Sequence, residues 1–239
     1  IRHQTPDHYP NIKASLQQLR DQYHVNNIRV LIRPTHECWT TLPKMVYDRS
    51  DEREDHLAIL MKGIPRKDIE PYWFSLSNHD FKLLVARNKA LLGGYHELTS
   101  LFNRSEFVSD FELGQKWESY SHARGSYMFI SSFRHAMSIS SFVLGKLRSA
   151  TYFTYDDLDD LPYHWLQHGR HLPWMNGLHE TIYVFGWQSY NIIDTLKPFW
   201  DQSADIALMD SLDKMKVRAD ETTYGFALEN AFPAIMLAL

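Results

Sequence analysis

Glycine is scarce in this sequence: 10 of the 239 residues are glycine, where average usage would give roughly 17. Loops that hold phosphate groups use glycine because its backbone N–H groups can approach the ligand closely. The shortage bears directly on nucleotide binding, since few loops of this chain could bring their backbone so near to a phosphate.

Cysteine, clustered basic residues and long apolar runs are also scarce or missing. The single cysteine, Cys38, excludes an internal disulfide and is typical of a reducing compartment. The formal net charge of −4 comes without a block of Lys and Arg, which phosphate neutralisation requires, so we expect no nucleic-acid partner. No apolar run reaches the roughly 20 residues of a membrane span. We therefore expect a cytoplasmic protein without a transmembrane segment or signal peptide.

Apolar and aromatic residues make up much of what is present. The chain is 44% hydrophobic and 14% aromatic, which is typical of a folded globular protein. Its length of 239 residues suits one large domain or two small ones, each with a core of its own.

The stretch 179–209 predicts a strand, a tight turn, a helix and a second strand. Residues 181–185 are β-branched and aromatic without alternation, as in a strand buried on both faces. Gly186 ends this strand, Ser189 can cap the following helix, and residues 205–209 form the second strand. A parallel strand pair with a crossover helix is the simplest interpretation. Ligands of such sheets bind beyond the carboxyl ends of the strands, so we expect the turn 185–189 to border any cleft.

Hydrophobic periodicity predicts the remaining elements. In the first half we expect helices at 11–23, 51–61, 89–102 and 112–120, and strands at 28–32, 37–42, 70–77 and 81–86. In the second half, residues 127–133, 136–144 and 147–155 predict three strands of an antiparallel meander. A helix to about residue 167 follows, and a final helix at 224–239 is one that Pro233 must kink or restart.

This order of elements resembles the actin-like ATPase superfamily, which has a ribonuclease H-like fold. The second half reads β-β-β-α-β-α-β-α, the repeated unit of that superfamily. The first half resembles the first lobe of pilus- and secretion-associated bacterial actin-like proteins. The matching segments there are the strand at 28–32, the step Thr41–Leu42–Pro43, the charged helix, the strand at 81–86 and the helix ending Tyr95–His96–Glu97–Leu98.

Three further segments extend the resemblance. Residues 107–117 resemble the passage into the second lobe, 182–186 the adenosine-side strand and turn, and 231–239 the closing helix. The chain also looks like an uncharacterised bacterial family of degenerate actin-like domains. The resemblance implies an α/β fold of two lobes, with residues 1–122 as the first and 123–239 as the second. The first lobe is expected to be incomplete, because its opening three-strand meander is missing.

The chain departs from this family at its nucleotide site. Active members open each lobe with a strand that ends in Asp and Gly, where the acid helps to hold Mg²⁺ and the backbone binds phosphate. The corresponding second-lobe turn here has Ser131 and Ser132 and neither Asp nor Gly. Without the carboxylate, metal neutralisation of the phosphate charge is lost. We therefore expect no ATP hydrolysis and no bound ATP or Mg²⁺, and interpret the chain as a non-catalytic scaffold or protein-interaction domain.

Residues from two turns are expected to border the cleft of such a domain. They are Ser131, Ser132, Arg134, Gly186, Trp187, Gln188 and Ser189. We expect a protein partner, and peripheral association with a membrane complex stays open.

Two alternative functions involve other chemistry. The first is a nucleotide-binding protein with an altered phosphate site, where Arg134 supplies the positive charge in place of a metal. The second is a metal-dependent hydrolase: His164 and His168 have the i, i+4 spacing that presents two imidazoles to one metal, with aspartates at 156–160 nearby. The ordinary interpretation of these histidines is a polar helix end.

Three smaller patterns have both a functional and a structural interpretation. His36 and Cys38 share one face of a predicted strand, as a base and a thiol nucleophile would, but a lone strand cysteine is usually a small buried hydrophobic residue. The acidic cluster at 156–160 could supply paired carboxylates, yet helix capping explains it more simply. Three tryptophans flank the predicted cleft or crossover helix and could line a binding surface. They are Trp174, Trp187 and Trp200.

Overall fold

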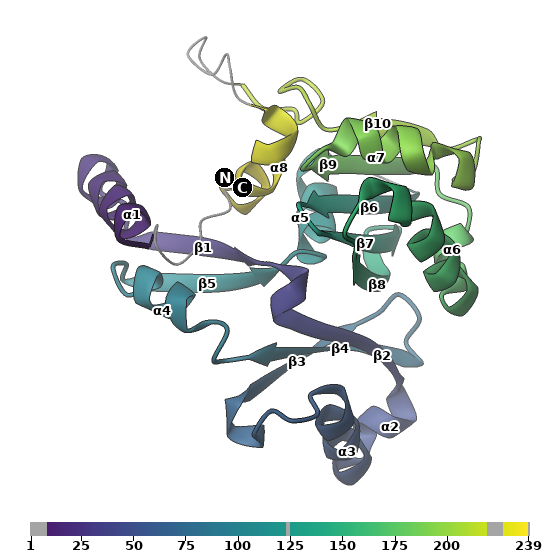
Figure 1. Ribbon diagram of the computed structural model, residues 1–239, viewed down its shortest axis with the longest axis horizontal. Helices are drawn as coiled ribbons and strands as arrows, with labels where there is room; N and C mark the ends of the chain where they lie inside the picture. The colour runs from purple at the N-terminus through teal and green to yellow at the C-terminus, as the bar shows by residue number, and fades with distance from the viewer. Residues whose placement is uncertain (1–8, 123–124, 219–226, 239) are drawn as a thin grey trace.

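The computed structural model describes residues 9–122, 125–218 and 227–238 (Figure 1). In this part of the chain the strands form a five-stranded, a three-stranded and a two-stranded sheet. The helices are α1 (Tyr9–Tyr23), α2 (Lys44–Asp48), α3 (Ser50–Leu60), α4 (Gly93–Thr99), α5 (Glu112–Ser121), α6 (Leu161–His171), α7 (Ser189–Leu196) and α8 (Leu228–Ala238).

The five-stranded sheet forms the second half of the molecule. Its strands β6 (Ser126–Phe133), β7 (Ala136–Val143) and β8 (Lys146–Thr154) make an antiparallel meander. The strand β9 (Thr181–Gly186) pairs in parallel with β6, and β10 (Asp205–Leu208) pairs in parallel with β9. The resulting order is β10-β9-β6-β7-β8. This confirms the predicted meander followed by a parallel pair with a crossover helix.

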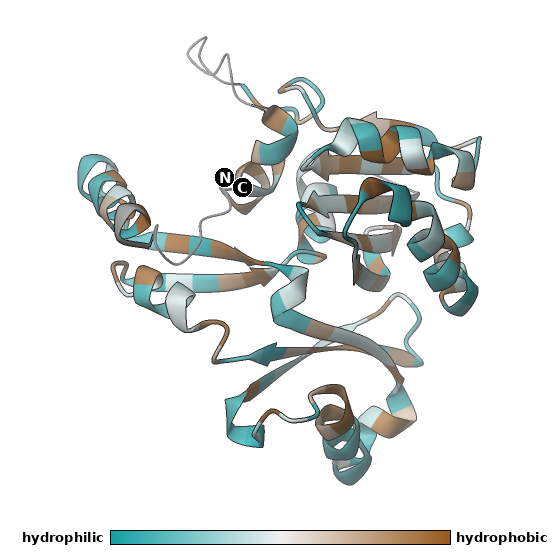
Figure 2. Ribbon diagram, viewed as in Figure 1, coloured by the Kyte–Doolittle hydropathy of each residue, from teal (hydrophilic) through white to brown (hydrophobic). Residues whose placement is uncertain are grey.

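Helices cover both faces of this sheet. Because alternate side chains of a strand point to opposite faces, Met128 and Ile130 of β6 pack with α6 and α7, while Tyr127 and Phe129 pack with α5 and α8. Burial on both faces explains why β6 and β9 lack hydrophobic–polar alternation. Figure 2 shows hydrophobic residues recurring along β9 and α8.

The first half contains the other two sheets. The strands β1 (Asn27–Ile32) and β5 (Arg104–Ser109) form a parallel pair next to α1 and α4. Between them the chain makes an antiparallel sheet of β2 (Glu37–Pro43), β3 (Ile69–Ser75) and β4 (Phe81–Asn88), in the order β2-β4-β3. A small core on one face of this sheet includes Leu57 of α3 and Leu84 of β4.

The two halves share one hydrophobic core. Val85 of β4, Phe111 before α5, Phe142 of β7 and Phe232 of α8 belong to the same buried cluster. The helix α8 also contacts β1, where the Arg29 side chain donates a hydrogen bond to the backbone oxygen of Leu237 at 2.8 Å. A relative movement of the halves would therefore disturb buried apolar contacts.

Some local predictions were wrong. The strand β5 was not predicted, because its first three residues are exposed and polar and give no strand pattern. The helix expected at 89–102 is restricted to Gly93–Thr99, so its two glycines lie at the helix start, where they cost less than in the interior. The helix α8 continues through Pro233, so of the two expected outcomes, a kink or a restart, the restart does not occur. Residues 224–226 and 239 of the predicted helix lie outside the described residues.

Candidate functional site

The carboxyl ends of β6 and β9 lie side by side. Ser132 is opposite Gly186 in the parallel register. The φ of Gly186 is +99°, and a Cβ at this position would lie 2.2 Å from the Ser132 backbone oxygen, so no larger residue fits without rearrangement. The Ser132 hydroxyl donates to the Trp187 carbonyl at 2.6 Å, and the Trp187 N–H donates to the Ser132 carbonyl at 2.9 Å. These bonds tie the two turns together.

The neighbouring Ser131 is turned towards a buried carboxylate, Asp110, which follows β5. The Ser131 hydroxyl donates to Oδ1 of Asp110 at 3.0 Å, and the Ser138 hydroxyl of β7 donates to Oδ2. Only 4% of Asp110 is exposed. Burial raises the pKa of this carboxyl to about 6, although the two hydroxyl donors oppose the shift. Asp110 thus links the end of β5 to the five-stranded sheet.

A second buried polar cluster lies around Glu37 at the start of β2. Arg87 Nε donates to Glu37 Oε1 at 2.6 Å, and the Ser109 hydroxyl donates to the same oxygen at 2.8 Å. The Trp39 indole N–H donates to the other oxygen at 2.7 Å. The Arg87 guanidinium also lies 4.2 Å from the ring centre of Tyr72. Burial raises the pKa of Glu37, and the Arg87 charge opposes this shift.

A cavity of about 430 Å³ opens between the two halves. Arg33 and Thr35 reach it from the connection between β1 and β2, and Arg134 and His135 from the turn between β6 and β7. The remaining lining residues, at the β7 start and the β8 end, are Ala136, Thr154, Tyr155 and Asp156.

The walls of this cavity are held by local contacts. The Tyr155 hydroxyl donates to the Phe133 carbonyl at 2.9 Å, and its N–H donates to the His135 carbonyl at 3.2 Å. The Arg33 guanidinium carbon lies 5.5 Å from the centre of the Phe133 ring, at the end of β6. Burial lowers the pKa of Arg33, whereas Arg134 is exposed. The cavity can therefore present positive charge from both halves to a ligand.

The structure separates the residues expected to border a cleft. Arg134 lines the cavity, whereas Ser131 and Ser132 are buried in the sheet beneath it. Residues 186–189 adjoin Ser132 but are not among those that line the cavity. Trp187 is 44% exposed, and Gln188 has a φ of +53°, a strained value for a residue with a side chain.

Ser189 does not have the expected capping role. It is the first residue of α7, with Gln188 in the capping position, and its side chain makes no capping hydrogen bond. Its buried hydroxyl finds no partner among the residues that the structure describes.

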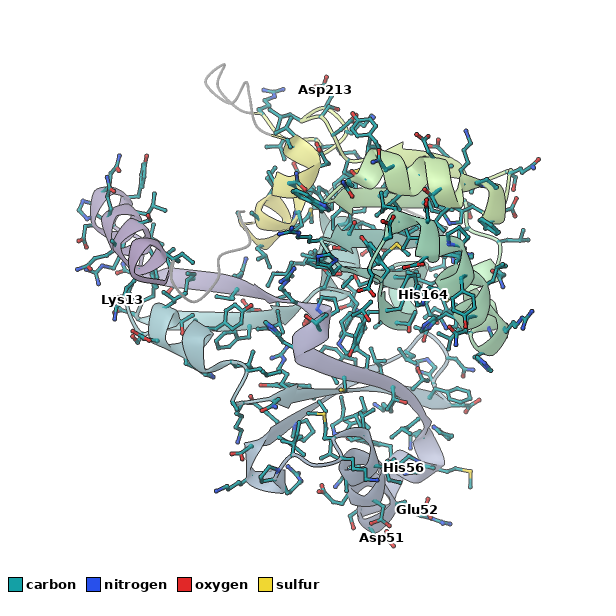
Figure 3. The ribbon with its side chains drawn as sticks, in the orientation of Figure 1. Lys13, Asp51, Glu52, His56, His164 and Asp213 are labelled. Carbon is teal, nitrogen blue, oxygen red and sulfur yellow. The ribbon has the colours of Figure 1, made fainter. Side chains whose placement is uncertain are left out.

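The histidines proposed as metal ligands lie against an aromatic ring. His164 and His168 on α6 have ring centres 5.4 and 5.0 Å from that of Phe153. Figure 3 labels His164 among the side chains of the second half. Burial and the charges of His164 and His171 lower the pKa of His168. Within residues 9–122, 125–218 and 227–238, no group of three or more His, Cys, Asp or Glu side chains is placed to hold a metal.

The other patterns have local structural explanations. Burial raises the pKa of the Cys38 thiol, the opposite of what activates a nucleophile, and the His36 ring is in contact with the Tyr95 hydroxyl at 3.3 Å. Asp157 caps the short helical turn 158–160, as the capping interpretation predicted. The tryptophans Trp174 and Trp200 are buried, so Trp187 is the exposed one of the three.

Sequence analysis alone did not find Asp110, Glu37, Arg87 or Arg33. Each lies far along the chain from its contacts: Asp110 bonds to Ser131 and Ser138, and Glu37 to Arg87. The sequence offers no local spacing that would connect them. Arg134 was predicted to border the cleft from its place in the turn after Ser131 and Ser132, and it lines the cavity.

Comparison with known proteins establishes the fold. No protein-family model matches the sequence, and no curated protein matches it either. Among solved structures, a chain of the PilM–PilN type IV pilus biogenesis complex is 11% identical with a TM-score of 0.67, and the match covers 100% of this chain and 86% of that one. A protein of Bacteroides thetaiotaomicron with an actin-like ATPase fold and unknown function is 16% identical with a TM-score of 0.51, covering 85% and 79%.

At sequence identities this low, similarity to solved structures establishes the fold alone. The chain has the two-lobed actin-like ATPase fold, which confirms the fold class predicted from the order of its elements.

Proposed function

We propose that this chain is a non-catalytic actin-like domain that serves as a scaffold or protein-interaction module. The observation that supports the proposal most is the arrangement at the ends of β6 and β9. There the Ser131 and Ser132 hydroxyls are engaged by Asp110 and the Trp187 carbonyl. Phosphoryl transfer relies on a metal and on hydrogen-bond donors that face the phosphates. Here the two serine hydroxyls donate to Asp110 and to the Trp187 carbonyl instead.

A protein partner is part of this proposal. One structural neighbour, PilM, is solved in a complex with PilN. In this chain the β9–α7 turn exposes Trp187, and Tyr190 of α7 is 55% exposed, and such aromatic residues are enriched in interfaces. None of the helices that the structure describes is both long and apolar enough to cross a bilayer. We propose a cytoplasmic location, with any membrane association made through the partner.

The decisive experiment measures phosphate release from ATP with Mg²⁺. We expect the purified protein to release phosphate no faster than a protein-free control. Gly186→Ala changes the strand end at the proposed site, and Gly63→Ala is its control. Gly63 also has a positive φ, +88°, but an added Cβ there would meet no neighbouring atom. Magnesium-dependent turnover that Gly186→Ala abolishes and Gly63→Ala retains would overturn the proposal.

A second candidate is a nucleotide-binding protein in which Arg134 replaces the metal charge. The observation that favours it is that Arg33 and Arg134 line one cavity. Calorimetric titration with ATP and ADP in the absence of Mg²⁺ tests it. Binding that Arg134→Ala weakens would support this candidate, and flat titrations would remove it. No observation on the residues described favours the metal-dependent hydrolase, whose two histidines lie against the Phe153 ring.

A further inference from the structure

The cavity between the lobes carries one net positive charge. Its lining includes two arginines, Arg33 and Arg134, against one carboxylate, Asp156, when His135 is neutral. A nucleoside di- or triphosphate carries several negative charges, more than this net positive charge balances. A single carboxylate matches this balance better.

Arg33 is a partly buried side chain of this site, and its environment favours a bound anion. Its guanidinium lies against the Phe133 ring and is partly removed from water, which lowers its pKa. An anion at this position would stabilise the charged form of the side chain. Arg33 comes from the first lobe and Phe133 from the second, so an anion bound here would touch both.

The chemistry of the lining suits a planar acceptor. Guanidinium groups present a planar fork of N–H donors that fits a carboxylate in a bidentate manner. The hydroxyls of Thr35 and Thr154 add donors, and Ala136 adds an apolar wall. The volume of about 430 Å³ is within the roughly 300–1,000 Å³ typical of ligand sites.

We propose that this cavity is a docking site for the carboxylate of an acidic side chain of a protein partner. The proposal rests on the interaction function above and specifies the chemistry of the partner. Arg134 of the second lobe and Arg33 of the first hold the carboxylate together. A bound partner segment thereby bridges the two lobes.

The test measures the binding of short peptides to the full chain. The ends of the peptides are chemically blocked except where a free carboxyl terminus is stated. One pentapeptide has a central glutamate among alanines, a second has glutamine there, and a third is all alanine with a free terminal carboxylate. Binding is followed by ¹H–¹⁵N spectra that include the arginine Nε–H signals. We expect the glutamate peptide to bind about tenfold or more tightly than the glutamine peptide, because charge-assisted hydrogen bonds are the stronger ones. It should also bind more tightly than the peptide whose only carboxylate is its terminus.

Variants locate the binding. Arg134→Ala, at an exposed position, should lower the affinity for the carboxylate peptides about tenfold. Arg134→Lys should lower this affinity less. Arg170→Ala is the matched control, because Arg170 is an exposed arginine of α6 that does not line the cavity. The Arg170→Ala variant should bind the peptides with the same affinity as the unmodified protein.

Several results would overturn the proposal. Equal binding of the glutamate and glutamine peptides would do so, as would binding that Arg134→Ala leaves unchanged. Tighter binding of ADP or inorganic phosphate with the same dependence on Arg134 would assign the cavity to the nucleotide candidate instead. These failures are distinct from failure of the non-catalytic function, which is decided separately by phosphate release from ATP.

Discussion

Replacing Asp110 by asparagine should change how the stability of the protein depends on pH. The pKa of Asp110 is raised from 3.8 to about 6 by burial. The folded protein therefore binds the proton more tightly than the unfolded chain does, and the free energy of unfolding rises as the pH falls from about 7 to about 4. A difference of about 2 pKa units at about 1.4 kcal/mol each amounts to about 3 kcal/mol.

Asparagine keeps the shape of the site without its titration. Its amide oxygen can accept from Ser131, and its NH₂ group can donate to the Ser138 hydroxyl after that hydroxyl rotates. The Asp110→Asn variant should therefore be more stable than the unmodified protein at pH 7 by up to about 3 kcal/mol. The advantage should vanish near pH 4, where the aspartate is protonated in the fold.

Urea unfolding followed by tryptophan fluorescence between pH 4 and 8 measures this difference. The urea concentration at the midpoint should shift, while the slope of the free energy of unfolding against urea concentration stays constant. Such a result shows that stability alone has changed. Asp194→Asn, at an exposed position on α7, controls for the loss of one negative charge. If Asp110→Asn retains the pH dependence of the unmodified protein, the raised pKa of Asp110 is not the source of that dependence.

Other substitutions and one chemical probe test separate parts of the structure. Glu37→Gln should destabilise the fold by about 3–5 kcal/mol in urea unfolding, because it leaves the Arg87 charge buried without its carboxylate; adding Arg87→Met should restore part of the loss, and an unchanged midpoint for Glu37→Gln would refute the role of the pair. Gly186→Ala should lose more than about 1 kcal/mol beyond Gly63→Ala, since both have positive φ but a Cβ at Gly186 would overlap the neighbouring strand; equal losses would contradict the close approach. Cys38 should react with iodoacetamide at pH 7 more slowly in the folded protein than in urea, because burial raises its pKa and the thiolate is the reactive form; equal or faster reaction when folded would show an activated thiol.

The elements of the second half were predictable because its strands and helices carry strong periodic patterns. The turn Gly145–Lys146 and the apolar runs on either side fixed two strands of the meander, and the helix after Gly186 has its apolar residues at helical spacing. Fold-level resemblance then supplied the arrangement, which the structural neighbours confirm. The division into lobes at residues 1–122 and 123–239 stays a prediction.

The buried polar groups and the cavity were not predictable in the same way. Asp110 sits between Ser109 and Phe111 just before a helix, where an aspartate usually caps or faces solvent. Its burial depends on Ser131 and Ser138, which only the folded chain brings near. Arg33 likewise reaches Phe133 through tertiary packing, because 100 residues of chain separate them in sequence. Sequence patterns report on local periodicity and leave such contacts undetermined.

The most direct test of the central claim is an NMR titration with ADP and Mn²⁺ in place of Mg²⁺. A bound paramagnetic metal broadens the amide signals of nearby residues. We expect the signals of Ser131, Ser132 and Gly186 to keep their width, because Ser131 is bonded to Asp110 and Ser132 to Trp187, and we propose that these strand ends bind no metal-nucleotide. Selective broadening of those three signals, reversed by a chelator, would contradict it.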